Sequence, residues 1–157
     1  MTPPGSLSRT PSSAVTATTI VSSLLTVQTP GAGFTDLTAE VAKFVQEAVA
    51  REGAVTLFIR HTSASLTIQE NADPTVLDDL LTALTRAAPE NVGWRHDTEG
   101  PDDMPAHIKT MLTATSLHIP VLKRELALGT WQAIYLIEHR ARPHRREIVL
   151  QFAGRIG

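Results

Sequence analysis

A polar segment at residues 61–74, HTSASLTIQENADP, contains the first side chains that could do chemistry. The pattern predicts a buried strand before it, over Ala54 to Ile59, and a helix start at its end, where Asp73 can cap free backbone N–H groups and Pro74 needs no donor. The residues between these elements carry more hydrogen-bonding groups than a turn requires. We interpret them as part of a binding site; the alternative is a polar turn followed by a helix cap. The candidate residues are His61, Thr62, Ser63, Glu70, Asn71 and Asp73.

A second polar cluster, HDTEGPDDMPAHIK at residues 96–109, concentrates imidazole and carboxylate groups. Nitrogen and oxygen ligands of this kind suit a divalent cation. Asp103 lies four residues before His107, which places both on one face of the helix predicted to begin at Asp103. An acidic loop with a capping aspartate is the alternative, but the two histidines favour a site. Its candidate residues are His96, Asp102, Asp103, His107 and Lys109.

The third cluster ends a predicted strand within LGTWQAIYLIEHRARPHRR, residues 128–146. The strand alternates over residues 131–139 and is apolar on both faces in its middle, so both faces are expected to be buried. Its polar end, Glu138, His139 and Arg140, is expected to emerge at the sheet edge. Arg140 is suited to forked hydrogen bonds to phosphate, because a guanidinium group presents parallel donors. The remaining arginines, Arg142, Arg145 and Arg146, are interpreted as a solvated basic turn.

The elements that must position these clusters follow from apolar periodicity. Helices are predicted from Leu37 to Val49 with Gly53 as a C-terminal stop, from Pro74 to about Ala87, and from Asp103 with three apolar residues facing inward. Those inward residues are Ile108, Met111 and Leu112. Strands are predicted at residues 19–27, 54–59, 117–122, 131–139 and 147–152, with a short piece around Leu126. Phe58, Leu80, Leu81 and Ile134 are expected in the core.

This element order predicts the fold class. Strands grouped after helices with short connections favour an α+β fold: a single compact domain with a largely antiparallel, sandwich-like sheet and about three helices. The first 18 residues are rich in proline, serine and threonine and are predicted to be a flexible leader. The domain is therefore expected to span residues 19–157.

Composition narrows the function classes. A formal net charge of −2 and 4% aromatic residues give no basic field or stacking platform for nucleic acid, so no nucleic-acid partner is expected. Cysteine is absent, and no apolar run is long enough to span a membrane. We therefore expect a cytoplasmic protein without a membrane partner.

The three quoted segments, in this order and spacing, resemble the YjbQ family over about residues 18–155. The resemblance implies a small α+β domain that assembles as a homotrimer, with polar pockets near the subunit boundaries. It also implies a secondary thiamine-phosphate synthase activity, which joins hydroxymethylpyrimidine diphosphate to thiazole phosphate and releases diphosphate. The protein is thus expected to bind a small phosphorylated substrate.

The resemblance and this chemistry suggest roles for the candidate residues. A divalent cation, Mg²⁺ or Zn²⁺, would neutralise the departing diphosphate together with Lys109 and Arg140. The expected metal ligands are His96, His107 and His139. The expected catalytic residues are His61, Glu70, His107 and Glu138. The expected substrate-binding residues are Thr62, Ser63, Asn71, Asp73, Asp102, Asp103, Lys109 and Arg140.

Two other functions fit the same residues. A metal-dependent hydrolase of a small phosphorylated metabolite would use Glu70 or Glu138 as general base for a metal-bound water. A binding protein for such a metabolite would keep Lys109 and Arg140 and need no water chemistry.

Overall fold

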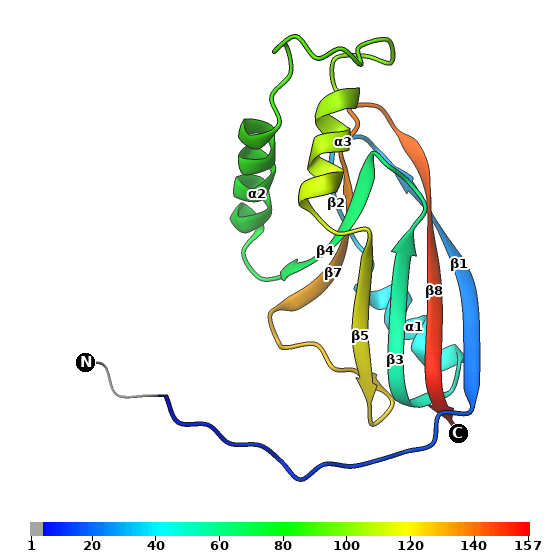
Figure 1. Cartoon of the computed structure of the whole chain (residues 1–157). Helices are drawn as coiled ribbons and strands as arrows, with labels where there is room; N and C mark the ends of the chain where they lie inside the picture. Colours follow the sequence, from blue (N-terminus) through cyan, green and yellow to red (C-terminus); the bar gives the residue numbers. More distant parts are fainter. Residues whose placement is uncertain (1–4) are drawn as a thin grey trace.

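Two antiparallel sheets and three helices make up the computed structural model, which describes residues 5–157 (Figure 1). The larger sheet has the strand order β1-β8-β3-β5-β6. Its strands are β1 Thr19–Thr29, β3 Ala50–Ile59, β5 Ser116–Leu122, β6 Glu125–Leu126 and β8 His144–Ile156. The smaller sheet has the order β2-β7-β4. Its strands are β2 Gly33–Asp36, β4 Ala64–Glu70 and β7 Gln132–Glu138.

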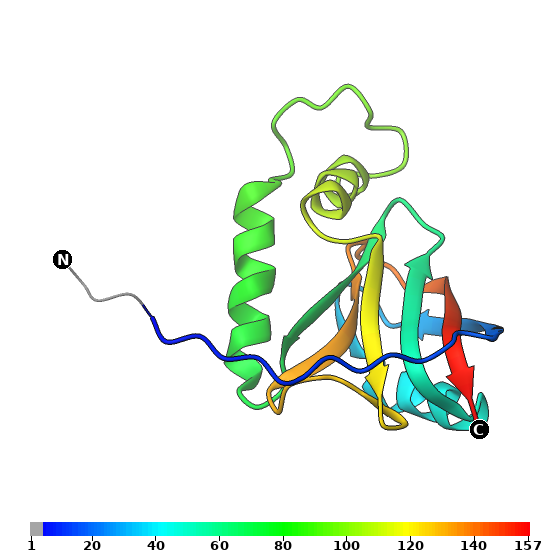
Figure 2. The ribbon, with the colours of Figure 1, turned by 60° about the horizontal axis from the view of Figure 1, so that its bottom comes forward.

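The core lies between the two sheets and is closed by helix α1, Thr38–Glu47 (Figure 2). The helix buries Val41, Phe44 and Val45, as its apolar spacing predicts. In β7 all residues from Ala133 to Glu138 are buried, which confirms that this strand is covered on both faces. Ile134 is fully buried in the core, as expected.

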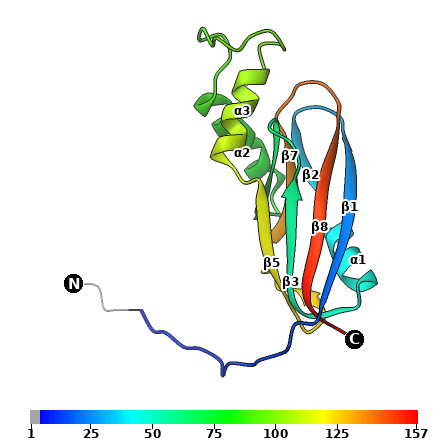
Figure 3. The same ribbon diagram turned by 45° about the vertical axis from the view of Figure 1, so that its right-hand side comes forward.

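Helices α2, Pro74–Ala87, and α3, Asp103–Leu112, lie side by side next to the smaller sheet (Figure 3). The predicted start of α2 is confirmed, because the Asp73 carboxylate accepts a hydrogen bond from the Thr75 backbone N–H at 2.9 Å. The loop at residues 88–102 joins the two helices and projects beyond the sheets (Figure 1). The fold class is therefore confirmed: one compact α+β domain with antiparallel sheets and three helices.

Two strands, β2 and β4, were not predicted from the sequence. Residues 64–70 were expected in a polar connection, yet they form β4, in which Ala64, Ser65 and Leu66 are buried. The pairing of β4 with β7 satisfies the backbone and overrides the local polarity. Strand β2 was also not predicted, because four residues are too short for a readable alternation.

The predicted helix stop at Gly53 is wrong. Helix α1 ends at Glu47, and Gly53 lies inside β3 with φ +153°. A Cβ at Gly53 would lie 2.2 Å from the Ala153 carbonyl oxygen, so glycine serves there for a close strand approach.

The predicted inward face of α3 is also wrong. Met111 and Leu112 are 80% and 56% exposed, and Ile108 is half-buried, whereas Asp103 is buried. The helix turns the face of Asp103, Pro105 and Ala106 toward the interior in place of the predicted apolar face, because Asp103 has partners inside the protein. Of the expected core residues, Leu80 and Leu81 are only half-buried and Phe58 is 48% exposed on the outer face of the larger sheet.

Residues 5–18 form neither helix nor strand, and the Thr18 N–H donates to the Gly154 carbonyl. The predicted leader begins at residues 1–4, which lie outside the described residues. Between residues 5 and 157, no helix has both the length and the apolar character needed to cross a bilayer.

Candidate functional site

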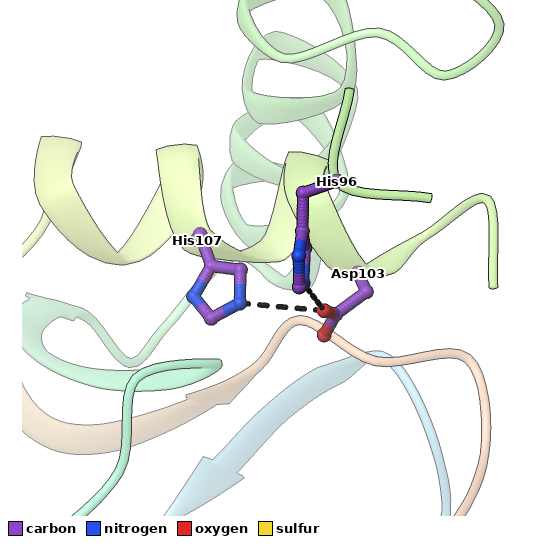
Figure 4. A group of neighbouring side chains, drawn as sticks. All are labelled: His96, Asp103 and His107. Carbon is purple, nitrogen blue, oxygen red and sulfur yellow. Dashed lines mark hydrogen bonds and ion pairs between the residues drawn. The ribbon is translucent and has the colours of Figure 1, made fainter. Parts of the chain in front are cut away.

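A buried carboxylate, that of Asp103, organises the candidate site (Figure 4). Asp103 is the first residue of α3 and is 2% exposed. Its Oδ2 lies 2.7 Å from His96 Nε2 and 3.3 Å from His107 Nε2. The helix places His107 one turn after Asp103, and the loop before α3 carries His96 to the same atom. The sequence-predicted proximity of these three side chains is therefore found in the structure.

The Thr62 carbonyl sets the tautomer of His107. This carbonyl accepts a hydrogen bond from His107 Nδ1 at 3.1 Å, so Nδ1 carries a proton. In the neutral ring the lone pair is then on Nε2, which faces Asp103. A backbone carbonyl that orients an imidazole in this way is typical of metal-ligating histidines.

Arg140 holds the two aspartates in place. Its Nε donates to Asp102 Oδ2 at 3.0 Å, its Nη1 donates to Asp103 Oδ1 at 2.7 Å, and its Nη2 donates to the Glu99 carbonyl at 2.8 Å. The Asp102 carboxylate also accepts from the Ala141 N–H at 2.8 Å. Arg140 was expected to bind substrate phosphate, but these contacts make it a positioning residue for Asp103.

The charges at the site are mutually stabilised. The hydrogen bond to Asp103 raises the pKa of His96. Burial opposes ionisation of Asp103, but the hydrogen bond from His96 and the charge of Arg140 hold its pKa below the usual range. For Asp102, burial is likewise outweighed by the hydrogen bonds from the Ala141 N–H and Arg140, which lower its pKa. The site therefore presents ionised carboxylates next to two imidazoles.

The residues before β4 form a junction with β8. The His61 Nε2 accepts a hydrogen bond from the Glu147 N–H at 2.8 Å, so this nitrogen carries no proton. Burial, and after it Arg146, lower the pKa of His61. The Ser63 carbonyl and hydroxyl oxygens accept from Arg146 Nη2 at 3.2 and 3.0 Å. His61 and Ser63 are thus occupied in joining strands, and Thr62 contributes its carbonyl to His107.

Glu138 and Arg146 form a buried ion pair, which corrects two expectations. Glu138 was expected as a catalytic base but is 1% exposed, and it accepts from Arg146 Nε at 2.7 Å and from the Thr29 hydroxyl at 2.9 Å. Burial alone would raise the pKa of Glu138, but hydrogen bonds from Arg146 and from the Arg140 N–H lower it. Arg146 was interpreted as part of a solvated turn, yet it is 4% exposed. Arg146 is buried and not solvated because it pairs with Glu138, which is itself buried on β7.

His139 does not join His96 and His107, although all three were expected to bind one metal. It is 4% exposed, and its Nε2 shares a hydrogen bond with the Ser65 hydroxyl at 2.8 Å. The Thr113 hydroxyl donates to the same serine oxygen at 2.6 Å. Burial, and after it the charge of Lys109, lower the pKa of His139 to about 4. His139 is therefore a neutral residue of the interior.

The buried His139 predicts a loss of stability in acid. The unfolded chain takes up a proton at this residue below pH 6.5, whereas the native state does so only near pH 4. The contribution is fully present above pH 6.5 and is lost as the pH falls to 4, by about 3 kcal/mol in total. Urea unfolding at pH 7 and pH 4.5 measures it. The pH dependence should shrink in His139→Gln and persist in His118→Gln, since His118 lies exposed on β5. Equal pH dependence in both variants would contradict the assignment.

Three predicted site residues lie at the other end of β4. The Glu70 carboxylate accepts weakly from the Asp73 N–H at 3.4 Å, the Asn71 side chain donates to the Thr130 carbonyl at 3.4 Å, and Asp73 caps α2. Strand β4, whose seven residues begin directly after Ser63 and end at Glu70, spans about 20 Å between these residues and Ser63. Within one chain, the first motif therefore does not form one site.

A lysine and a hollow lie near the aspartate pair and Arg140. Lys109 of α3 is half-buried, and burial lowers its pKa. A hollow of about 620 Å³, here called the Arg140 pocket, borders Asp102. Its lining includes Glu90, Glu99, Asp102, Arg140 and Arg142.

Sequence reasoning missed several partners at the site, namely Ser65, Thr113, Arg146 and the carboxylate of Glu99, which lies 3.4 Å from His96 Nε2. Of these, only the contact of Glu99 with His96 could have been predicted from the sequence, because the two residues are three positions apart. The others meet residues 8 to 74 positions away across strands.

Comparisons with known proteins agree with this fold. The family model described as "UPF0047 protein YjbQ-like" matches residues 23–155. The UPF0047 protein sll1880 of Synechocystis is 47% identical over 134 residues, which cover 85% of this chain and 91% of that protein. A crystal structure of an uncharacterized conserved protein of the YjbQ/UPF0047 family from Clostridium acetobutylicum has a TM-score of 0.76 at 35% identity, covering 82% of this chain and 98% of that one. The conserved hypothetical protein TT1486 from Thermus thermophilus has a TM-score of 0.71 at 37% identity, covering 86% and 99%.

Proposed function

Because the chain belongs to the UPF0047 YjbQ-like family and brings two histidines to one buried aspartate, we propose that it is a metal-dependent enzyme that forms thiamine phosphate. The reaction would join hydroxymethylpyrimidine diphosphate to thiazole phosphate and release diphosphate. One observation supports the proposal most: one ligand atom from each of His96, Asp103 and His107 lies within 4.8 Å of the others.

The donor set suits a bound metal of borderline softness. Two imidazole nitrogens and one carboxylate oxygen are ligands that Zn²⁺ takes in catalytic sites, whereas Mg²⁺ prefers oxygen alone. Of the two cofactors expected from the sequence, Zn²⁺ fits these donors better, and Mg²⁺ would enter with the diphosphate. The Thr62 carbonyl and Arg140 hold His107 and Asp103 in place for such an ion.

The proposed reaction needs charge neutralisation more than acid–base chemistry. The thiazole nitrogen forms a bond to the methylene carbon of the pyrimidine, and the carbon–oxygen bond to diphosphate breaks with its electron pair on the oxygen. A divalent cation would offset the charge of the leaving group. Lys109, half-buried on the helix that carries His107, is the cation of this chain best placed to assist. The Arg140 pocket has the volume of a small-ligand site and room for a phosphorylated substrate.

Metal and product measurements test the proposal. Purified protein, analysed for zinc by mass spectrometry, is mixed with both thiamine precursors and Mg²⁺, and thiamine phosphate is followed by chromatography. Zinc at about one ion per chain and product formation that EDTA abolishes are expected. A folded protein that holds zinc but forms no product from these precursors would overturn the assigned reaction.

A metal-dependent hydrolase of a small phosphorylated metabolite is the second candidate. One contact favours it: the Glu99 carboxylate lies 3.4 Å from His96 Nε2 and is 62% exposed, so it can reach a water at the site. In this candidate function Glu99 is the proposed general base, in place of Glu70 or Glu138, which were expected in that role. Release of inorganic phosphate from hydroxymethylpyrimidine phosphate without thiazole would identify this activity.

The homotrimer expected from the family resemblance stays part of the proposal. Helix α2 carries Leu77, Leu80, Leu81 and Leu84 on one face, but none of its residues is buried. On the neighbouring α3, Met111 and Leu112 are exposed. Apolar side chains that are half-buried on α2 and exposed on the adjacent α3 suit an interface with further copies of the chain. A neighbouring copy can then supply Glu70 and Asn71, which their own chain holds far from its histidines.

A charge on this face should break the assembly. Met111→Glu is expected to convert trimer into monomer, because a buried unpaired carboxylate costs several kcal/mol. Sedimentation equilibrium measures the mass. The matched control is Ala83→Glu, an exposed position of α2 outside the leucine face, which should leave the trimer intact. Parent protein with the mass of one chain would contradict the proposed assembly.

A further inference from the structure

A small hollow lies next to the metal-binding candidates. Most of its lining comes from the loop that joins α2 to α3, whose course Figure 1 shows. It has a volume of about 290 Å³ and is here called the Trp94 pocket. Its side chains include Asn91, Trp94, His96, Asp97 and Met104. Ligand pockets for drug-sized molecules range from about 300 to 1,000 Å³, so this one matches a single substituted ring. His96 belongs both to this pocket and to the group around Asp103.

The indole of Trp94 is held in place. Its Nε1 donates to the Pro89 carbonyl at 3.0 Å, which satisfies the polar edge of the ring. Asn91 and Gly93, with φ of +59° and +80°, fold the loop tightly before it. Trp94 is nevertheless 36% exposed, so part of its surface is available to a ligand. An ordered aromatic ring with an open face is suited to stacking another flat ring.

The remaining side chains suit a nitrogen heterocycle. Met104, half-buried on α3, can pack its polarisable thioether against an aromatic ring. The Asn91 amide both donates and accepts, which matches an exocyclic amine next to a ring nitrogen, the same pairing with which asparagine reads adenine. The Asn91 and Asp97 side chains are both exposed on the loop, so their polar groups are accessible to a ligand.

We infer that the Trp94 pocket binds the aminopyrimidine ring of the substrate, stacked on Trp94 and read at its edge by Asn91 and Asp97. The inference rests on the proposed function and adds to it the residues that select the ring. Since His96 lines the pocket, a ring held there places its diphosphate-bearing arm toward the metal-binding group. The thiazole phosphate, which lacks an exocyclic amine, would take the Arg140 pocket instead.

The test uses Trp94 as its own reporter. The chain has two tryptophans, Trp94 and Trp131, and Trp131 directly precedes β7, which begins at Gln132. Trp131→Phe therefore leaves Trp94 as the single tryptophan. The EDTA-treated variant is titrated with the uncharged alcohol 4-amino-5-hydroxymethyl-2-methylpyrimidine, and calorimetry on the parent protein gives the affinity. Saturable quenching of Trp94 fluorescence is expected, because the ring binds without metal or phosphate.

Substitutions separate stacking from edge recognition. Trp94→Phe keeps an aromatic face and should stay within about threefold of the parent affinity, whereas Trp94→Leu should lose roughly tenfold to a hundredfold. Asn91→Gly tolerates the positive φ and removes the amide, so it should weaken binding of the aminopyrimidine. Circular dichroism checks that each variant folds.

The outcomes distinguish this inference from the proposed function. No quenching, or equal affinity in Trp94→Leu and the parent, overturns the inference, even where zinc binds and product forms. Saturable quenching of Trp94, together with the expected loss of calorimetric affinity in Trp94→Leu, supports the ring site, even where no thiamine phosphate appears and the assigned reaction is wrong.

Discussion

Replacing His107 with alanine is expected to abolish thiamine-phosphate formation, a loss of roughly a hundredfold or more, and to leave the melting temperature nearly unchanged. The substitution removes one of the two imidazoles that face Asp103 Oδ2. The helix should tolerate it, because alanine is the best helix former and His107 packs only partly into the protein, with 33% of its side chain exposed. The Thr62 carbonyl, on an exposed residue, can bond to water instead.

A second histidine supplies the control. His144 donates through Nδ1 to the Arg142 carbonyl at 2.8 Å, a contact similar to that of His107, but it has no place in the group around Asp103. His144→Ala should keep both zinc and activity. Zinc analysis, product formation and thermal unfolding are measured on both variants. A large thermal loss in His107→Ala without a functional defect would assign His107 a structural role.

The second large effect concerns stability. Glu138→Gln should destabilise the fold by about 3–5 kcal/mol, because it leaves the Arg146 guanidinium buried without a counter-charge. In a chain of 157 residues this corresponds to a fall of about 10 °C in melting temperature. Thermal unfolding and urea titration at pH 7 measure the change.

The matched control is Glu147→Gln, which affects exposed pairs. Glu147 contacts Arg60 at 3.2 Å and Arg145 at 2.6 Å, and both arginines are more than half exposed. Its loss should cost less than about 1 kcal/mol. Glu138→Gln that unfolds like the parent yet loses activity would restore the expectation that Glu138 is a catalytic base.

Local patterns predicted most of the fold. The Asp73 and Pro74 pair marked the start of α2, and alternation marked β7 as covered on both faces, since caps and periodicity depend on residues close in sequence. Strand β4 was missed because its stability comes from pairing with β7, more than sixty residues later, and its own residues are largely polar.

The sequence alone determined the family, through its three motifs, and it placed Asp103 and His107 one helical turn apart in the same motif as His96. Only the tertiary structure decided what the other polar residues do. Glu138 is hydrogen-bonded to Thr29, 109 residues away in the sequence, and His139 to Ser65, 74 residues away. Sequence periodicity reports only on near neighbours, so it could not show that these residues are buried structural pairs and not site residues. Burial made them structural, because a charged or polar group taken out of water must bond to whichever partner the fold provides.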